Sequence, residues 1–419
     1  MKKTVQIQLS AMMFLQFFVW GAWFVTMWRY LNHLNFDGTQ IGAAYSTTGW
    51  AAVISPFFVG MIADRFFSAQ KVLAFLHLVG AGLMAWVSTI TDPLLFFWVL
   101  LAYTVCYMPT LSLSNSISFA QMTNPETEFP PIRVLGTIGW IAAGLLVGFM
   151  PKSVFGLDTI EDTNIPMRIA AASSLLLAIY CMFLPNTPPK STGQKVTASD
   201  ILGLKALGLL KDRSFAIFIL CSLLICIPLS FYYQSANGFL GEIGLKNAAA
   251  KMTLGQVSEF FFMLTMPFFL ARLGIKKLML VAMAAWILRY VFFAFGNTQS
   301  TLTTSLLYLG ILLHGICYDF FFVTGQIYVD KKAPADIRAG AQGFIAFVTL
   351  GLGMIIGNLI NGVVTRRYTV TSMTDGLETT THNWQAIWLI PAVMAVAVVG
   401  LFALTFADRT AAKNEIKEA

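Results

Sequence analysis

Charged residues are scarce in this sequence, and their scarcity excludes an ordinary soluble fold. Only 11% of the 419 residues are charged and 57% are hydrophobic, whereas soluble domains carry about 25% charged residues. A soluble chain of this length would form two or three domains with far more charge. The mean hydropathy of +0.72 therefore indicates a membrane protein.

Cysteine and histidine are also few, which argues against a disulfide framework and a metal centre. None of the cysteines forms a C-x-x-C pair, and all five lie in apolar runs, at Cys106, Cys181, Cys221, Cys226 and Cys317. The four histidines are scattered, and we interpret each as a packed or interfacial side chain. The sequence contains no residues at metal-ligand spacing, no phosphate-binding loop and no Ser/His/Asp arrangement. It therefore predicts neither an enzyme nor a bound cofactor or metal.

Long apolar runs are abundant instead. Runs of about 20 residues are long enough for an α-helix to cross a hydrocarbon core about 30 Å thick, and backbone groups inside lipid must be paired within the segment. Lys2 and Lys3 precede a run that is too long and too aromatic for a signal peptide, so we expect an uncleaved first helix. The sequence predicts twelve transmembrane helices, roughly at residues 5–30, 41–63, 70–90, 94–120, 130–150, 167–185, 213–240, 250–271, 277–296, 302–329, 338–364 and 385–407.

The uneven distribution of Lys and Arg predicts the topology of these helices. With the N-terminus inside, the predicted cytoplasmic loops and both tails hold 18 of the 27 Lys and Arg residues. Cytoplasmic loops of membrane proteins carry such an excess of positive charge, so both termini are predicted to be cytoplasmic. The net charge of +7 therefore reflects the topology in the bilayer and does not indicate a nucleic-acid partner.

A polar stretch at residues 186–212 divides the apolar runs into two sets of six. The tripeptide PIR at residues 131–133 is answered by DIR at residues 336–338, about 205 residues later. Two six-helix halves in parallel repeat resemble the plan of major facilitator transporters, whose substrate binds between the halves near the midplane. We predict an all-α membrane protein with two pseudo-symmetric six-helix bundles, at residues 1–185 and 213–408, joined by a cytoplasmic linker at 186–212 and followed by a cytoplasmic tail at 409–419.

The segment from Gly60 to Arg65 resembles the G-x-x-x-D-R motif between the second and third helices of major facilitator transporters. Asp64 and Arg65 are predicted to hold the cytoplasmic face shut; an ordinary interfacial Asp–Arg pair is the alternative. Ala271 replaces the acidic residue in the second half, so such a latch is one-sided. Small residues let helices approach closely, which we expect at Gly136, Gly139, Gly144, Gly351, Gly353 and Gly357.

Three charged residues, Arg133, Glu259 and Asp319, lie inside apolar runs. A charge in a membrane helix costs roughly 2.5–3.5 kcal/mol on insertion scales, so such residues indicate function. A carboxylate in a dry cavity can take up a proton, which makes Glu259 and Asp319 candidates for proton coupling. The structural alternative is that Arg133 or Arg289 pairs with one of these carboxylates only to hold the bundle together.

Polar and aromatic residues accompany these charges at helical spacing. Gln256 lies three residues before Glu259 and shares its helix face. Arg133, Thr137 and Trp140 follow one another about a turn apart and form a polar stripe that ends in an aromatic ring. This pattern suits a ligand with hydroxyl groups on one side and a flat ring on the other.

Several local segments make a resemblance specific. The sequence resembles the bacterial nucleoside permeases of the NupG/XapB type, which are nucleoside:proton symporters of the major facilitator superfamily. The likeness covers essentially the whole chain and is carried by the segments FLQF (14–17), WGAW (20–23), YMPTL (107–111), FPPIRVLGTIG (129–139), LTMPFFL (264–270) and AAWILR (284–289).

This resemblance implies roles for the residues already singled out. Positions that match Arg133, Thr137, Gln256, Glu259 and Asp319 contact the nucleoside in that family, and we include Tyr318 beside Asp319. The position that matches Trp140 is Phe there, so a larger ring is expected to stack on the substrate here. The family's Gln-x-x-Asn pair falls on Ser230 and Tyr233 in an ungapped match, whereas this chain has such a pair four residues later, at Gln234 and Asn237. We keep all four as candidate substrate ligands, and this stretch is expected to set the choice of substrate.

The resemblance implies proton-coupled nucleoside uptake across the bacterial inner membrane by alternating access. We expect a monomer whose partners are nucleosides, protons and the lipid bilayer. Two alternatives stay open: a major facilitator carrier of another polar solute, such as a sugar or glycoside, and a transporter-derived sensor that binds a ligand without accumulating it. Whether Glu259 or Asp319 carries the proton also stays open.

Overall fold

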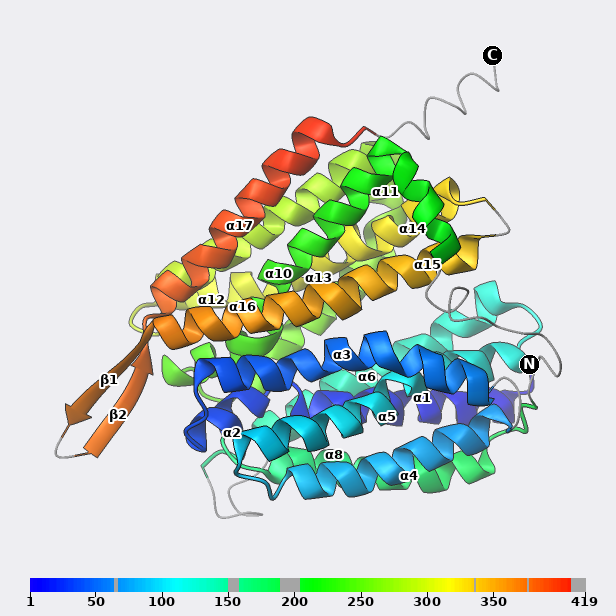
Figure 1. Cartoon of the computed structure of the whole chain (residues 1–419), viewed down its shortest axis with the longest axis horizontal. Coiled ribbons are helices and arrows are strands. Elements are labelled where there is room, and N and C mark those ends of the chain that lie inside the picture. Colours follow the sequence, from blue (N-terminus) through cyan, green and yellow to red (C-terminus); the bar gives the residue numbers. More distant parts are fainter. Residues whose placement is uncertain (64–66, 150–157, 189–203, 335–336, 375–376, 408–419) are drawn as a thin grey trace. The chain divides into compact units, whose positions relative to one another are not determined.

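The computed structural model describes residues 1–63, 67–149, 158–188, 204–334, 337–374 and 377–407 (Figure 1). Within these residues, ten helices are long and apolar enough to cross a membrane. The prediction of a helical, multi-pass membrane protein is therefore confirmed. Many large apolar side chains, such as Leu404, Leu302 and Val393, are exposed to the surroundings, as expected where lipid rather than water is the solvent.

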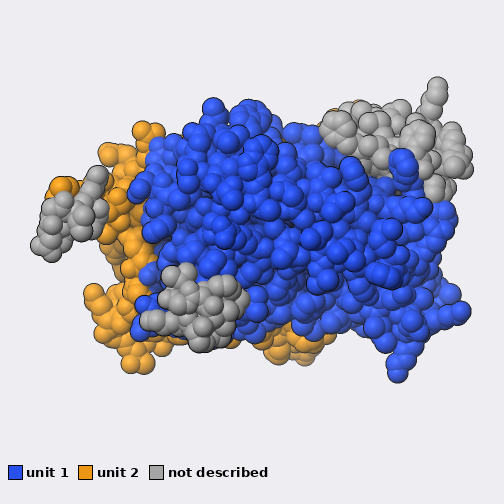
Figure 2. Space-filling model, turned by 90° about the horizontal axis from the view of Figure 1, so that it is seen from below, with its two compact units in different colours: residues 1–196, 234–241, 245–253 blue, residues 197–233, 242–244, 254–419 orange. Residues whose placement is uncertain are grey.

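The chain divides into two compact units, which Figure 2 shows in different colours. Unit 1 comprises residues 1–196 together with 234–241 and 245–253, and unit 2 comprises residues 197–233, 242–244 and 254–419. Unit 1 is therefore built on the N-terminal half of the sequence but includes two short segments of the C-terminal half. The domain limits predicted from the sequence stay a prediction.

Unit 1 is a bundle of helices with short connections. Its helices are α1 (Lys3–Trp23), α2 (Met27–His33), α3 (Gly38–Ala63), α4 (Ala69–Val87), α5 (Pro93–Ala120), α6 (Pro125–Phe149) and α8 (Ile165–Tyr180), followed by the 3-10 turn η1 (Cys181–Phe183). Helix α1 packs against α6 and α8, and α4 packs against α5 and α8. The first predicted span is divided by a turn at residues 24–26.

Glycine lets α1 and α6 approach each other closely. A Cβ atom on Gly139 would lie 2.1 Å from the carbonyl oxygen of Phe14, and one on Gly136 would lie 2.7 Å from the ring of Phe17. A real Cβ atom essentially never lies within 3.0 Å of such an atom, so a side chain at either position would force α1 and α6 to shift. The predicted close packing is confirmed here and also in unit 2, where a Cβ on Gly353 would lie 2.6 Å from the Cβ of Cys226.

Unit 2 contains longer and less regular helices. In chain order they are η2 (Leu204–Lys211), α10 (Arg213–Glu242), α11 (Ala248–Phe295), α12 (Thr301–Leu312), α13 (His314–Tyr318), the π-helix η3 (Asp319–Val323), α14 (Thr324–Lys332), α15 (Arg338–Ala346), the π-helix η4 (Phe347–Gly353), α16 (Met354–Arg367) and α17 (Trp384–Thr405). Residues 234–241 of α10 and residues 248–253 of α11, on either side of their connection, belong to unit 1. Gly274, with φ 67° and ψ 174°, breaks the helical geometry of α11 between the two predicted runs at 250–271 and 277–296.

A β-hairpin between α16 and α17 was not predicted from the sequence. Strands β1 (Thr369–Thr374) and β2 (Leu377–His382) pair antiparallel, with Thr369 opposite His382. Both strands are rich in threonine, a β-branched residue that favours extended backbone. The hairpin is attached to α10 because the Glu242 carboxylate accepts from the His382 backbone N–H (2.8 Å) and lies 2.7 Å from its Nδ1.

Candidate functional site

In unit 1, α6 carries Arg133, Thr137 and Trp140 on successive turns, as predicted. The Arg133 guanidinium lies 4.3 Å from the ring centroid of Phe17 on α1, within range for a cation–π contact. The Trp140 ring meets the edge of Trp20, also on α1, with centroids 5.5 Å apart. The stripe thus begins at a cation and ends in an aromatic cluster, and all three side chains are partly accessible.

A buried network of polar side chains lies next to this aromatic cluster. The Gln16 amide donates to Thr110 Oγ1 (2.7 Å), and its oxygen lies 2.9 Å from His77 Nε2. The other ring nitrogen of His77 lies 2.9 Å from Ser174 Oγ. Tyr107, whose hydroxyl donates to the Gln16 carbonyl (2.6 Å), contacts Trp20 with its ring. His77 is therefore a packed side chain, as expected. The sequence did not predict that its ring would contact Gln16 of α1.

In unit 2, the region around Glu259 on α11 is held against α13. A Cβ on Gly315 would lie 2.6 Å from the Glu259 backbone nitrogen, so the two backbones touch. Ser258 Oγ accepts from the Gly315 N–H (3.2 Å) and donates to the carbonyl of Leu312. His314 Nε2 lies 3.7 Å from the Glu259 carboxylate. Glu259 is thus fixed by backbone contacts and keeps a side-chain exposure of 17%.

Asp319 is the most deeply buried of the predicted site carboxylates. Its exposure is 0%, and neither carboxylate oxygen has a hydrogen-bond partner within the described residues. It opens the π-helix η3, and such wide turns within α-helices are frequent at functional sites. Tyr318, one residue earlier, lies 5.9 Å from the ring of His314.

Arg289 does not form the ion pair that the structural alternative required. Its side chain is 0% exposed, and none of its nitrogens has a hydrogen-bond partner in the described part of the chain. Its guanidinium instead lies 4.2 Å from the ring centroid of Tyr232, which stacks on His314 at 5.1 Å. A cation–π contact, rather than a carboxylate, accommodates this charge.

The two candidate ligand pairs on α10 have different surroundings. Ser230 is buried and its hydroxyl donates to the Ile227 carbonyl (2.7 Å), while Tyr233 meets the His314 ring edge at 6.0 Å. Gln234 is 0% exposed, and its amide has no hydrogen-bond partner within the described residues. Asn237 donates to Glu161, 2.9 Å away. Both pairs stay predictions.

A cavity of about 70 Å³ in unit 2 is too small to be the substrate site. Ligand pockets commonly measure about 300–1,000 Å³, so this cavity has room for only a few waters. It is lined by Tyr318 and by residues of α10, η3, α14, α15 and η4, including Ser222, Gln326, Gln342 and Thr349.

The predicted cytoplasmic latch falls largely outside the described residues. Asp64 and Arg65 are not among the described residues, whereas Gly60 is part of α3. Within unit 2, the structure shows instead an ion pair that the sequence did not predict, between Lys332 at the end of α14 and Asp212 before α10, at 2.7 Å.

No group of three or more His, Cys, Asp or Glu side chains in the described residues could hold a metal ion.

Comparison with known proteins identifies the family. Residues 1–411 match the family described as nucleoside H+ symporter. The putative nucleoside transporter YegT of Escherichia coli is 49% identical over 417 residues, which cover 99% of this chain and 96% of YegT. The xanthosine permease of E. coli is 35% identical, with 96% of each chain covered. The crystal structure of nucleoside transporter NupG superimposes with a TM-score of 0.84 at 35% identity and covers 97% of this chain and 100% of that one. These relatives are transporters with the major facilitator fold and not enzymes, and this chain belongs to the nucleoside H+ symporter family.

Proposed function

We propose that this protein imports nucleosides together with protons across the bacterial inner membrane, as a monomer with both termini in the cytoplasm. The observation that carries the proposal is the family match over residues 1–411. The distribution of Lys and Arg supports the orientation. A proton that enters down a potential of 100 mV releases about 2.3 kcal/mol, which sustains roughly a 50-fold concentration ratio in a one-to-one symporter.

Each unit contributes candidate substrate ligands. From unit 1, Arg133 and Thr137 offer hydrogen bonds to the substrate, and Trp140 offers a flat face for the base. From unit 2, the predicted ligands are Gln256, Glu259, Tyr318 and Asp319. Helix α10 adds four candidates, of which Ser230 and Tyr233 belong to unit 2 and Gln234 and Asn237 belong to unit 1. Carboxylates accept hydrogen bonds from ribose hydroxyls or base N–H groups. The surrounding apolar side chains offer no such hydrogen bonds, so the substrate is expected to bind at these residues.

Asp319 is our candidate for the coupled proton. Its carboxylate is buried, and neither of its oxygens has a hydrogen-bond partner among the described residues. Taking up a proton removes the charge and lowers the cost of holding this group in an apolar interior. Glu259, which is partly exposed beside His314, is then left to bind the substrate.

The function is tested in proteoliposomes. Labelled uridine is expected to accumulate when the lumen is alkaline relative to the outside, and a protonophore should abolish the accumulation. Uptake that is indifferent to the pH gradient would contradict proton coupling. A competition panel of nucleosides, free bases and sugars tests the substrate class: displacement by a sugar, without displacement by nucleosides, would favour the alternative carrier.

Trp140→Ala is expected to weaken uridine binding by about 5- to 150-fold, because stacking of a base on an aromatic ring contributes about 1–3 kcal/mol. Trp140→Phe keeps an aromatic face and should bind within a few-fold of the wild type. Trp98→Ala on α5 is the matched control, since Trp98 is 58% exposed on the surface of unit 1. Equilibrium binding of labelled uridine to purified protein measures all three, and equal affinities of Trp140→Ala and Trp98→Ala would exclude the stacking role.

A further inference from the structure

A buried carboxylate in the connection between α6 and α8 joins the two halves of the sequence within unit 1. Glu161 is 1% exposed. Its Oε2 accepts from the Arg29 guanidinium of α2 (3.3 Å), from the Asn237 amide of α10 (2.9 Å) and from the Ala249 backbone N–H of α11 (3.2 Å). We call these four residues the Glu161 cluster.

The Glu161 cluster binds both ends of the connection between α10 and α11. Asn237 lies near the end of α10, and Ala249 lies in the first turn of α11. Both segments belong to unit 1, whereas the rest of each helix belongs to unit 2. Two of the three hydrogen bonds to Glu161 therefore attach helices of the C-terminal half to the bundle of the N-terminal half.

Glycines close the surroundings of the cluster. A Cβ on Gly238 would lie 2.0 Å from the ring of Trp28, one on Gly241 would lie 2.9 Å from the Arg29 guanidinium, and one on Gly148 would lie 2.5 Å from the Ala250 nitrogen. Such contacts leave no room for side chains larger than hydrogen. This dense packing explains why Glu161 is shielded from solvent although it lies in a connection.

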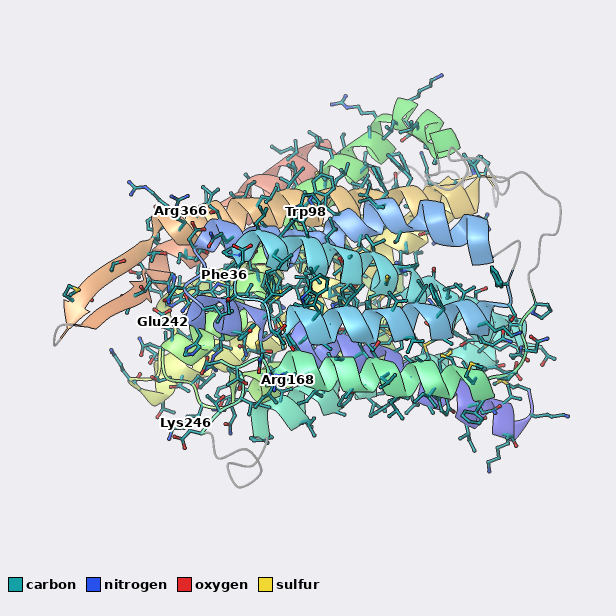
Figure 3. All side chains as sticks on the ribbon, turned by 60° about the horizontal axis from the view of Figure 1, so that its bottom comes forward. Phe36, Trp98, Arg168, Glu242, Lys246 and Arg366 are labelled. Carbon is teal, nitrogen blue, oxygen red and sulfur yellow. The ribbon has the colours of Figure 1, made fainter. Side chains whose placement is uncertain are left out.

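The cluster lies at the end of unit 1 away from the N-terminus. Helix α2, which carries Arg29, follows α1 at that end (Figure 1). Phe36, just after α2, and Lys246, between α10 and α11, lie toward the same end in Figure 3. With a cytoplasmic N-terminus, this is the outer end of the transporter.

We propose that Glu161 is the gate residue that holds the outer end closed, by binding the connection between α10 and α11 to the N-terminal bundle. The inference rests on the proposed function and its topology. Alternating access requires the outer end to open once in each cycle, and opening must break the hydrogen bonds from Asn237 and Ala249 to Glu161. Glu161 thereby acts on the transport rate without contacting the substrate.

The charge balance at Glu161 predicts how pH affects this gate. Burial raises the pKa of Glu161 above its ordinary value of 4.5, and the negative charge of Asp162 raises this pKa further. The positive charge of Arg29 and the hydrogen bonds from Asn237 and Ala249 lower the pKa, but the net shift is upward. Arg29 on α2 and Asp162 in the same connection are the charged groups that face Glu161, while α10 and α11 present a neutral amide and a backbone N–H. Opening exposes Glu161 and returns its pKa toward 4.5. The closed form therefore binds a proton more tightly, and lowering the pH toward 4.5 favours closure.

Hydrogen exchange of the segment 245–253 tests the gate without substrate or a proton gradient. Glu161→Ala is expected to speed exchange in this segment at least tenfold, since loss of a single charge-assisted hydrogen bond is enough for that factor. The matched control is Asp162→Ala, because Asp162 pairs with the same Arg29 but has no bond to α10 or α11 among the described residues. Its exchange in 245–253 should stay within about threefold of the wild type.

Glu161→Gln provides a second variant in case the alanine variant does not fold. Glutamine keeps the shape and one acceptor oxygen but cannot titrate. Corrected for intrinsic rates, exchange of 245–253 should slow as pH falls in the wild type and stay flat in Glu161→Gln. Equal exchange in Glu161→Ala and Asp162→Ala, or equal pH dependence in Glu161→Gln and the wild type, would overturn the proposal. Faster exchange in a protein that fails to transport nucleosides would leave the gate standing and refute the proposed function.

Discussion

Replacing Asp319 by asparagine is expected to abolish proton-driven accumulation of nucleoside, from roughly 50-fold at 100 mV to no gradient at all. Asparagine has nearly the same shape and can still hydrogen-bond a substrate, but it cannot take up and release a proton. Asp319 is fully buried at the start of a π-helix, without a hydrogen-bond partner in the described residues. Its expected contribution is therefore the proton and not a structural bond.

Exchange transport and gradient-driven accumulation distinguish a role of Asp319 in substrate binding from a role in carrying the proton. Exchange of labelled for unlabelled uridine across the vesicle membrane needs no net proton movement, so Asp319→Asn should retain it within a few-fold. Asp330→Asn on α14 is the control, because Asp330 is half exposed and pairs with Arg338 at 3.4 Å. If gradient-driven accumulation persists in Asp319→Asn and is lost in Glu259→Gln, then Glu259 and not Asp319 carries the coupled proton.

Gly139→Ala is expected to destabilise the protein more than other single methyl additions in unit 1. The added Cβ would lie 2.1 Å from the carbonyl oxygen of Phe14 and 2.9 Å from its carbonyl carbon. These are backbone atoms, so no side chain can rotate away and α1 must separate from α6. Overpacking costs about 1–3 kcal/mol, occasionally more. A fall in Tm of several degrees in detergent is expected, together with weaker uridine binding because α6 also carries Arg133 and Trp140.

Gly82→Ala on α4 is the matched control for this prediction. No heavy atom lies within 4 Å of the position of its added Cβ, and alanine is favoured over glycine in a helix by about 1 kcal/mol. Its Tm should equal or exceed that of the wild type. Melting curves recorded in one detergent would contradict the predicted clash if the two variants melted together.

The parts of the fold that depend on local pattern could be predicted from the sequence. Apolar runs of membrane-spanning length indicated helices, and glycines such as Gly136 and Gly139 indicated close packing, because both signals arise within one or two turns. The π-helices and the β-hairpin could not be predicted this way. A π turn differs from an α turn by a single residue, and the threonine-rich stretch before Trp384 resembles an ordinary polar loop.

The candidate site shows the same division. Arg133, Glu259 and Asp319 stood out because a charge in an apolar run is conspicuous wherever the helix packs. Glu161 did not stand out, because it lies among polar residues of a connection. Its partners Asn237 and Ala249 lie 76 and 88 residues further along the chain, so the contacts that surround this carboxylate could not be predicted from the local sequence.

Asp319 begins a π-helical turn, whose winding is wider than that of an α-helix. A wide turn holds one residue more than regular α-winding requires, about 1.5 Å of axial rise. If the turn shifts along the chain by one position, the residue it passes rotates by about 100° while the helix stays continuous. Asp319 is the first residue of such a turn, so the direction in which its carboxylate faces depends on where the extra residue is accommodated and not on any hinge in the chain.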